Sequence, residues 1–177
     1  TGDGAGAQVI YGTGHFKNTI IEGSRVSSFF DGILFSGASL GGTVYNCVVH
    51  SFYDGVERDG GTVTAKNTAS FNNVSDDFDG TFTVDYCASD DNDGTNSKTT
   101  SGADWDNEFT DWANGDFTAV PTGNIQNGVG PSVDANVPAL DIEGDTRSGA
   151  TAFIGVDEPS GEPPSIVPTN YYKTLLQ

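Results

Sequence analysis

The sequence contains no methionine, and its 177 residues include only two cysteines, two histidines and seven basic residues. Because a translated product begins with methionine, we expect a processed or trimmed chain, from which a leader, an anchor or earlier repeats have been removed. No segment has the length of a transmembrane helix, and no signal-peptide pattern opens the chain. Helix formers are scarce, whereas the 24 glycines and the many Thr, Val, Asn and Asp residues are typical of short strands joined by tight turns. The composition therefore predicts a single all-β domain.

Positive charge is also scarce, and the net charge is −18, from 25 acidic against 7 basic residues. Nucleic acid is a poor partner for such a surface, because phosphate binding needs clustered Lys and Arg. Anionic membranes are disfavoured for the same reason. Divalent cations, or a basic surface on a partner protein, fit better. The simpler interpretation, which we favour, is that the acidity keeps an extracellular particle soluble.

The first hundred residues of the chain contain an internal repeat. Asp-Gly pairs at positions 31–32, 54–55, 79–80 and 93–94 punctuate short runs of β-branched and aromatic residues. The segment 28–33 reads almost as 51–56, and 62–64 reappears as 81–83. The triplets 18–20, 46–48, 67–69 and 86–88 resemble one column that is sampled four times. Spacings of about 20 to 28 residues with strand-like patterning predict a solenoid whose rungs stack on one another.

The two cysteines share one column of this repeat. Cys47 and Cys87 occupy equivalent positions, with Thr68 on the rung between them. Two rung spacings separate them by about 9 to 10 Å, at about 4.8 Å per rung. A disulfide cannot span that distance without distortion of the backbone. We therefore expect both cysteines to be reduced and to point inward as small apolar side chains.

The domain limits follow from the composition along the chain. Residues 1–158 are predicted to form the solenoid domain, with a flexible lead-in over 1–7, rungs over about 8–95 and a cap over about 96–158. Within the cap, Trp105, Phe109 and Trp112 have the i, i+4, i+7 spacing of one helical face, so a short helical segment is expected to cover the end of the stack. An aromatic platform for sugars is the alternative.

The cap region also carries a family resemblance. Residues 109–117, Phe-Thr-Asp-Trp-Ala-Asn-Gly-Asp-Phe, are similar to a stretch near the end of many secreted and phage-encoded right-handed parallel β-helix proteins of the pectate-lyase-like kind. Asp141–Arg147 and Ile154–Glu158 resemble the family's D-I-x-G-x-x-R and I-G-x-x-E endings, in the same order. The resemblance implies a short right-handed parallel β-helix with a C-terminal cap. In the family this ending has a structural role and contains no catalytic residue.

Residues 159–177 form a proline-rich tail that ends in apolar residues. We interpret it as an extended arm that reaches onto a neighbouring subunit. Packing along its own solenoid is the alternative. The candidate anchors of the arm are Ile166, Val167, Tyr171, Tyr172, Leu175 and Leu176.

Two acidic segments, 76–80 and 89–94, resemble the first half of a calcium-binding loop with glycine near its end. Neither supplies the glutamate expected at the twelfth position, where the second segment has Thr100. Stacked rungs can still bring four carboxylates to one edge and form a weak calcium site. These candidate ligands are Asp77, Asp79, Asp91 and Asp93. Solvated turn aspartates are the alternative, and the sequence indicates no other cofactor.

No complete catalytic set is present. The Gly-His-Gly motif of polygalacturonases is missing. A pectate lyase needs an arginine base, and of the three arginines, Arg25, Arg58 and Arg147, the last belongs to the structural ending. His15 and His50 belong to no Ser/His/Asp or zinc spacing. The sequence therefore indicates a protein that is not an enzyme.

The function expected from these observations is a non-enzymatic structural module on the surface of a particle. The family resemblance implies a capsid-decorating, capsid-stabilising or spike-like virion protein of a phage, extracellular and homotrimeric, in contact with other virion or cell-surface proteins. Two alternatives stay open. One is a fragment of a polysaccharide lyase or glycoside hydrolase, which rests on analogy of fold alone. The other is an adhesin that binds glycans through aromatic residues such as Tyr53, Trp105 and Trp112.

Overall fold

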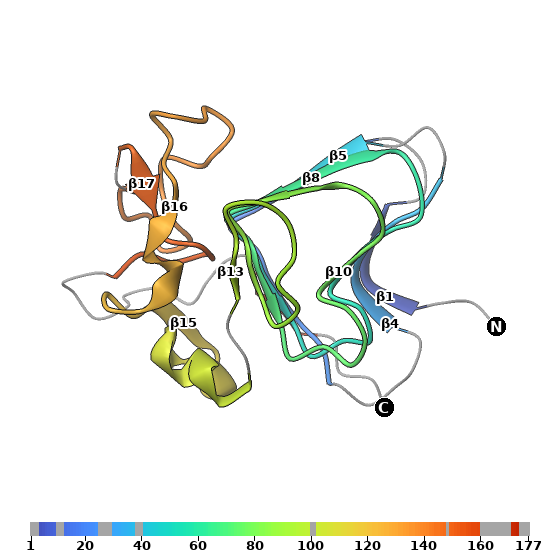
Figure 1. The fold of residues 1–177 in the computed structure, drawn as a ribbon, viewed down its shortest axis with the longest axis horizontal. Coiled ribbons are helices and arrows are strands. Elements are labelled where there is room, and N and C mark those ends of the chain that lie inside the picture. The colour runs from blue at the N-terminus through green and yellow to red at the C-terminus, as the bar shows by residue number, and fades with distance from the viewer. Residues whose placement is uncertain are drawn as a thin grey trace.

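The computed structural model describes residues 4–9, 13–24, 30–37, 41–99, 102–147, 149–159 and 171–173. It describes side chains throughout these ranges except at 4–9, 99, 102–103 and 171–173. The described part is all-β, and its only helices are three short 3-10 segments. Figure 1 shows a coil of stacked strands with a second layer of chain along one side. Parallel strands stacked in this way are consistent with the predicted solenoid.

Three parallel sheets form the coil. Sheet A contains β1 (Gly4–Val9), β4 (Phe30–Phe35), β7 (Val56–Arg58) and β10 (Phe78–Asp79). Sheet B contains β2 (Thr13–Lys17), β5 (Gly41–Tyr45), β8 (Thr62–Lys66) and β11 (Thr83–Asp85). Sheet C contains β3 (Ile20–Glu22), β6 (Val48–His50), β9 (Ala69–Phe71), β12 (Ala88–Ser89) and β13 (Lys98–Thr99), and it also includes β18 (Tyr171–Lys173). The chain visits A, B and C in turn four times, and each visit is one rung.

The register confirms the repeat that the sequence predicted. Ile20, Val48, Ala69 and Ala88 occupy one column of sheet C, so successive rungs are 28, 21 and 19 residues long. Residues 30–33 are also in register with 53–56, because Ile33 pairs with Val56 and the N–H of Tyr53 donates to the carbonyl group of Phe30. Among the strands of the coil, the sequence pattern did not reveal β2, β7, β10 and β13. Residues 4–7 are part of β1, paired with β4, and not a flexible lead-in.

The Asp-Gly pairs are not all equivalent. The N–H groups of Gly32 and Gly55 donate to the carbonyl groups of Asp54 and Asp76, so the pair that follows Asp54-Gly55 in the column is Asp76-Asp77. Asp79-Gly80 lies outside this column. At Gly55 an added Cβ would collide with Ser70 Oγ and with the carbonyl oxygen of Asp77, which explains why the column keeps glycine in its middle rungs.

The interior of the coil is apolar and contains both cysteines. Phe35, Val44, Val49 and Val63 are among its buried residues. Cys47 and Cys87 are free and buried, in one column with Thr68 as predicted. Each residue of this column, from Thr19 to Ser97, donates a side-chain hydrogen bond to the carbonyl group two residues earlier. The column therefore selects small side chains with an O–H or S–H group.

The corner between sheets B and C has a fixed backbone conformation. One residue per rung has φ between 47° and 52° there, a region in which asparagine is tolerated better than most residues. The corner residues are Asn18, Asn46, Asn67, Tyr86 and Asn96. Each corner turns the chain sharply, so that the triplet after it enters sheet C.

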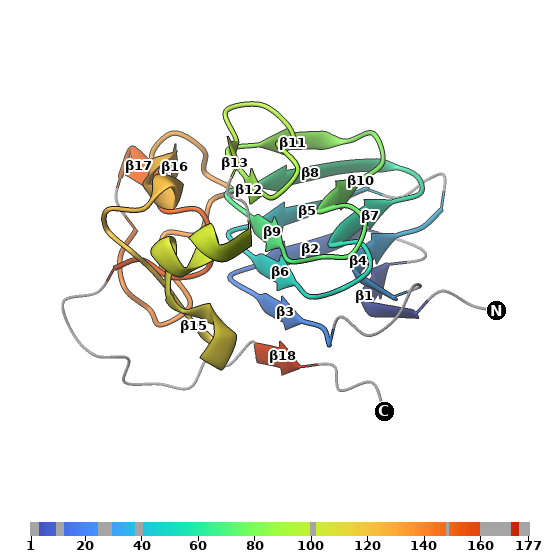
Figure 2. The same ribbon diagram turned by 60° about the horizontal axis from the view of Figure 1, so that its bottom comes forward.

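The C-terminal segment covers the side of the coil and not its end. It consists of η1 (Gly102–Asn107), β14 (Phe109–Asp111), η2 (Trp112–Asn114), β15 (Asp116–Ala119), η3 (Asn124–Asn127), β16 (Gly128–Val129) and β17 (Thr151–Ala152). Its apolar side chains pack on the outer face of sheet C, from Ile20 on the first rung to Ala88 on the fourth. Figure 2 shows this segment beside all the rungs. We call residues 102–159 the lateral cap.

The predicted end cap is therefore wrong in its position, and the reason lies in sheet C. Val48 and Ala69 point outward from sheet C and belong to one column of the repeat. The column forms an apolar stripe along the outside of the coil, and such a stripe is stable only when other residues pack on it. Trp105 stacks on Phe71 with ring centroids 4.1 Å apart. The helical face predicted for Trp105, Phe109 and Trp112 is split between two 3-10 segments and a strand.

The tail returns to the first rung. β18 pairs in parallel with β3, with Tyr171 opposite Ile20 and Lys173 opposite Glu22. It lies below β3 in Figure 2, at the end of sheet C where the coil begins. Ile166, Val167, Leu175 and Leu176 lie outside the described residues. For β18 itself, the structure has the arrangement that the sequence left as the alternative, on its own solenoid.

The burial of the cysteines predicts their reactivity. Burial raises the pKa of both thiols to about 12, so the thiolate, which is the reactive form, is absent near neutral pH. A thiol reagent at pH 8 is expected to modify neither cysteine in the native protein and to modify both after denaturation. Mass spectrometry of the labelled protein measures this directly, and a disulfide or a rapidly labelled native cysteine would contradict the assigned register.

Candidate functional site

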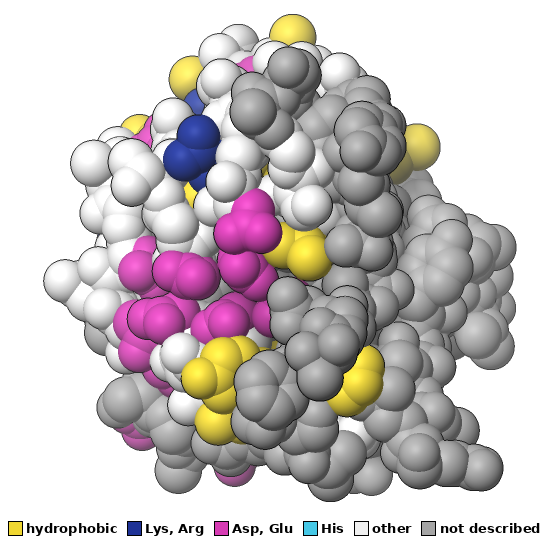
Figure 3. All heavy atoms as spheres, turned by 90° about the vertical axis from the view of Figure 1, so that its right-hand side faces the viewer, with side chains coloured by type: hydrophobic (Ala, Val, Ile, Leu, Met, Phe, Trp, Pro, Cys, Tyr) yellow, Lys and Arg dark blue, Asp and Glu magenta, His cyan; other side chains and the backbone are white. Residues whose placement is uncertain are grey.

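Acidic side chains gather on one face of the molecule. Figure 3 shows them clustered on the side that carries sheet A, with few basic side chains beside them. The stacking of rungs produces this face, because an acidic residue at one place in the repeat returns in the next rung. Asp31 and Asp54 are equivalent in this sense, and Glu57 lies beside Asp79 in the register of β7 and β10.

One acidic group lies between β4 and β7. Carboxylate oxygens of Asp31, Asp54 and Glu57 all lie within 4.8 Å of one another. Asp31 and Asp54 are buried, and Glu57 is half-buried. Burial, together with a hydrogen bond to Asp31 and the negative charges nearby, raises the pKa of Glu57 to about 8. Burial also raises the pKa of Asp54. Glu57 therefore holds a proton at neutral pH unless a cation replaces it.

A second acidic group lies at the last rung and contains Asp77, Asp91 and Asp93, again with oxygens within 4.8 Å of one another. Asp77 is fully buried, and it accepts hydrogen bonds from Asn73 Nδ2 at 2.7 Å and from the N–H of Asp90 at 2.5 Å. Asp91 accepts from the N–H of Asp77 at 3.0 Å. Oδ2 of Asp93 is shielded from solvent, and no described donor reaches it. Burial raises the pKa of Asp77 to about 8 and also raises that of Asp93.

The structure brings three of the four predicted calcium ligands together. Asp77, Asp91 and Asp93 form the second group, whereas Asp79 lies in β10 beside the first group, where its charge raises the pKa of Asp54. Carboxylate oxygens of this kind suit a hard cation such as Ca²⁺. The same geometry suits a structural role, because hydrogen bonds among Asp77, Asp90 and Asp91 join the start of the fourth rung to the turn that follows β12. Calcium binding therefore stays a prediction.

The first acidic group was not predicted, although the sequence contained its signal. Asp31 and Asp54 occupy the same position in the two best-matched segments, 28–33 and 51–56, and Glu57 follows Asp54 by three positions. Alignment of the repeats places both aspartates in one column. The Asp-Gly pairs were used only as punctuation between strands, and no cluster of their carboxylates was tested.

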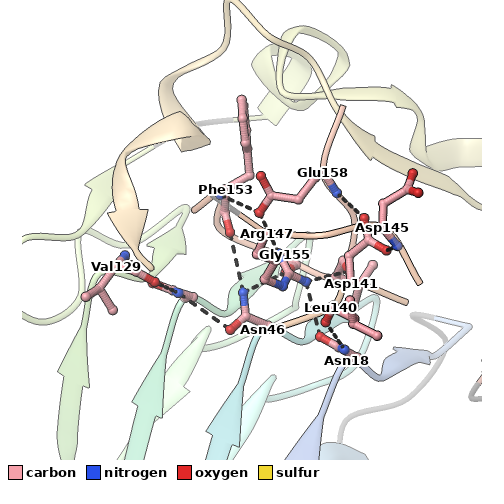
Figure 4. A network of polar contacts seen from close by, with 12 residues as sticks. Asn18, Asn46, Val129, Leu140, Asp141, Asp145, Arg147, Phe153, Gly155 and Glu158 are labelled. Atoms are coloured by element: carbon pink, nitrogen blue, oxygen red, sulfur yellow. Dashed lines mark hydrogen bonds and ion pairs between the residues drawn. The ribbon is translucent and has the colours of Figure 1, made fainter. Parts of the chain in front are cut away.

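A polar network fixes the lateral cap to the corner asparagines (Figure 4). Asn67 exchanges two hydrogen bonds with the backbone of Val129, at 2.6 and 2.9 Å. Asn46 Nδ2 donates to the carbonyl group of Gly155 at 3.3 Å, and Asn18 Nδ2 donates to that of Leu140 at 2.8 Å. Three successive rungs thus present one asparagine each to the cap.

The two motifs that resemble the β-helix ending meet in this network. Arg147 is fully buried and forms an ion pair with Glu158, with Nη1 to Oε1 at 2.8 Å. Its Nη2 atom donates to Asn18 Oδ1 at 3.1 Å and to the carbonyl group of Val156 at 2.7 Å. Asp141 Oδ1 accepts from the N–H groups of residues 143, 144 and 145. The residues that carry the resemblance therefore hold the cap in place.

The other candidates for chemistry are engaged in the fold. Trp105 is buried and its Nε1 donates to Asp90 at 2.7 Å, so it packs the cap and does not face a glycan. Trp112 is half-buried against Phe71. Arg58 donates to the carbonyl group of Gly61, and Arg25 lies outside the described residues. The amide of Asn73, in the triplet Asn73-Val74-Ser75, is bonded to Ser70 and Asp77.

The two histidines lie far apart. His15 is on β2, where its Nδ1 lies 2.8 Å from Thr43 Oγ1. His50 is buried on sheet C and stacks on Phe71. Neither belongs to an acidic group of the described structure.

Comparison of the chain with protein-family models, with curated proteins and with solved structures finds no match. The resemblance to right-handed parallel β-helix proteins thus stands on the motifs and on the stacked parallel strands. Among the described residues, no helix is long and apolar enough to cross a membrane.

The second acidic group predicts a stabilising effect of calcium. At pH 7, millimolar Ca²⁺ is expected to raise the melting temperature by several degrees, because an ion bound only to the native state adds about 2.7 kcal/mol at a hundredfold excess over its Kd. Replacement of the candidate ligand Asp93 by Asn should abolish most of this rise. Asp104→Asn removes the same charge from an exposed position and should leave the rise intact. An equal response to calcium in both variants would exclude this group as the site.

The network predicts a large cost for the loss of Asn67. Asn67→Ala leaves the N–H and C=O groups of Val129 buried without their partners, at about 1 to 3 kcal/mol each. Asn96→Ala is the matched control, because Asn96 has the same backbone conformation but is exposed and bonds only to Asp85 in the described structure. Urea unfolding should show Asn67→Ala as less stable by about 2 to 4 kcal/mol. Equal losses would mean that the backbone conformation, and not the cap, needs the asparagine.

Proposed function

We propose that this chain is a non-enzymatic structural module on the surface of a particle, of the kind that decorates or stabilises a phage capsid or forms a short spike. The coil would be a right-handed parallel β-helix. The right-handed sense is supported by the strong preference of parallel crossover connections for that hand and by the motifs of the cap. The module would be extracellular or on the virion surface.

This proposal rests mainly on one observation: charged and aromatic side chains that can catalyse a reaction or bind a ligand are bonded to other parts of the fold. Arg147 and Glu158 bind each other inside the cap, Trp105 is buried against Phe71, and Asp90 joins the last rung to Trp105. A catalytic or binding site keeps such groups free to meet a ligand. Here these side chains bond the stacked rungs to the lateral cap, as expected of a structural module.

The surface charge and the open ends support association with other proteins. A net charge of −18 favours a basic partner surface or bridging cations over nucleic acid or an anionic membrane. The short coil gains stability when its ends and sides are buried against copies of itself. The resemblance to β-helix spikes favours a homotrimer, which would contact other virion proteins or cell-surface proteins and glycans.

The tail is the element through which assembly is expected. β18 adds to the first rung by backbone pairing, and strand addition of this kind works equally between chains. In the assembled particle, residues 159–177 would extend across a neighbour, with Ile166, Val167, Tyr171, Tyr172, Leu175 and Leu176 as anchors. The pairing within one chain would then be the state of the isolated subunit.

Removal of the tail tests this proposal. Truncation after Gly161 should lower the mass in solution from that of a trimer to that of a monomer, while the circular dichroism spectrum of the coil is kept. Tyr172→Pro in the full chain is the matched variant, because proline disrupts pairing in the middle of β18 without shortening the chain. Light scattering measures the mass. A full-length monomer, or a truncated chain that assembles as well as the full one, would refute the arm.

A further inference from the structure

The lateral cap contains a pair of acidic side chains that face each other. Asp141 begins the loop of the first cap motif, and Asp157 lies near the end of the second. Both are buried, with 4% and 6% of their surface exposed. Their backbones run side by side, because the N–H of Ile142 donates to the carbonyl group of Val156 at 3.0 Å and Asp141 Oδ2 accepts the N–H of Glu158 at 3.2 Å. A proton on one carboxyl group can therefore bond to the other.

The hydrogen bonds around the pair assign that proton to Asp157. Asp141 accepts three backbone N–H groups at Oδ1, and its Oδ2 accepts the N–H of Glu158 at 3.2 Å. These are the roles of a carboxylate, which has only acceptors to offer. Asp157 Oδ2 accepts the hydroxyl group of Thr118 at 2.8 Å, whereas Oδ1 is buried and no described donor reaches it. A buried oxygen without a donor is costly if charged, and a proton on it supplies a bond to Asp141.

The surrounding charges are mostly of one sign. The negative charge of Glu143 raises the pKa of Asp157, and the charges of Asp116 and Asp145 raise the pKa of Glu143. The only basic side chain that acts on the pair in the described structure is Arg147, which already binds Glu158. Burial, the contact with Asp141 and the charge of Glu143 raise the pKa of Asp157 to about 7.

The pair lies where the last residues of the lateral cap contact β15. Asp157 forms a parallel bridge with Thr118 of β15, and Asp141 holds both its own loop and the backbone of Glu158. Three segments of the cap therefore meet at these two side chains (Figure 4 shows Asp141 with Arg147 and Glu158). We infer that Asp141 and Asp157 share one proton, and that this pair is a pH-sensitive clasp which holds the end of the cap against β15 in acid and loosens as the pH rises.

The direction of the pH effect follows from the two states of the chain. In the unfolded chain Asp157 loses its proton near its ordinary value of 3.8, whereas the folded protein keeps that proton to about pH 7. Between these values the folded state binds more protons, so the contribution of the clasp to stability is complete below about pH 4 and is lost as the pH rises to about 7.

Asp157→Asn tests the clasp, because an amide can donate to Asp141 and accept from Thr118 at any pH. At pH 8 this variant should melt higher than the wild-type protein, by roughly 3 °C or more, and the difference should vanish near pH 4. Asp104→Asn removes one negative charge from an exposed position and should show no such pH-dependent difference. A wild-type protein that is at least as stable as Asp157→Asn at pH 8 would overturn the clasp.

A second measurement needs no variant. Carbon-13 NMR of the side-chain carboxyl groups in the wild-type protein should show Asp157 titrating near pH 7. A titration of Asp157 at the ordinary value for an aspartate would also overturn the inference, whatever the stability of the variant.

Discussion

The corner between sheets B and C is the constraint on which the rest of the structure depends. A backbone with φ near 50° in every rung turns the chain in a single residue, which aligns the triplets that follow into sheet C. Asparagine is tolerated in that conformation, and its side chain then emerges at the edge of the sheet with a donor and an acceptor. The lateral cap binds the side chains of Asn18, Asn46 and Asn67. One backbone requirement thus determines both the stacking of the rungs and the attachment of the cap.

The position of the cap follows from the same geometry. Sheet C has an apolar residue on the outer face of every rung, such as Val48, and the first two rungs also have one on the inner face, such as Val49. Burial of the outer stripe by Trp105, Phe109 and Phe117 supplies the hydrophobic contribution, and the asparagine contacts supply the register. The two acidic groups of the coil, in contrast, lie at sheet A and at the turns of the last rung. Burial raises the pKa of Glu57 and of Asp77 to about 8, so each favours a bound proton near neutral pH.

The sequence predicted the structure best where the backbone requires the same type of residue in every rung. The cysteine column and the corner triplets follow from such repeats, and both are confirmed by the register. The strands β7 and β10 are too short to show a pattern, and β1 is a Gly-Ala stretch whose partner β4 supplies the pairing. The side of the coil that the cap covers was not predictable, because the outward apolar residues of sheet C were read together with the inward ones. The contact between Asp141 and Asp157 is a tertiary one, which no local pattern reveals.

The polar side chains of the corner asparagines and of the cap join the coil and its lateral cap into one body. Native-state hydrogen exchange tests this most directly, through the N–H groups of Val129 and Gly155 in the cap and of Val48 and Ala69 in sheet C. If the account is right, these four amides exchange with the same free energy of opening, equal to that of global unfolding. A cap that opens at a distinctly lower free energy than the coil would contradict it.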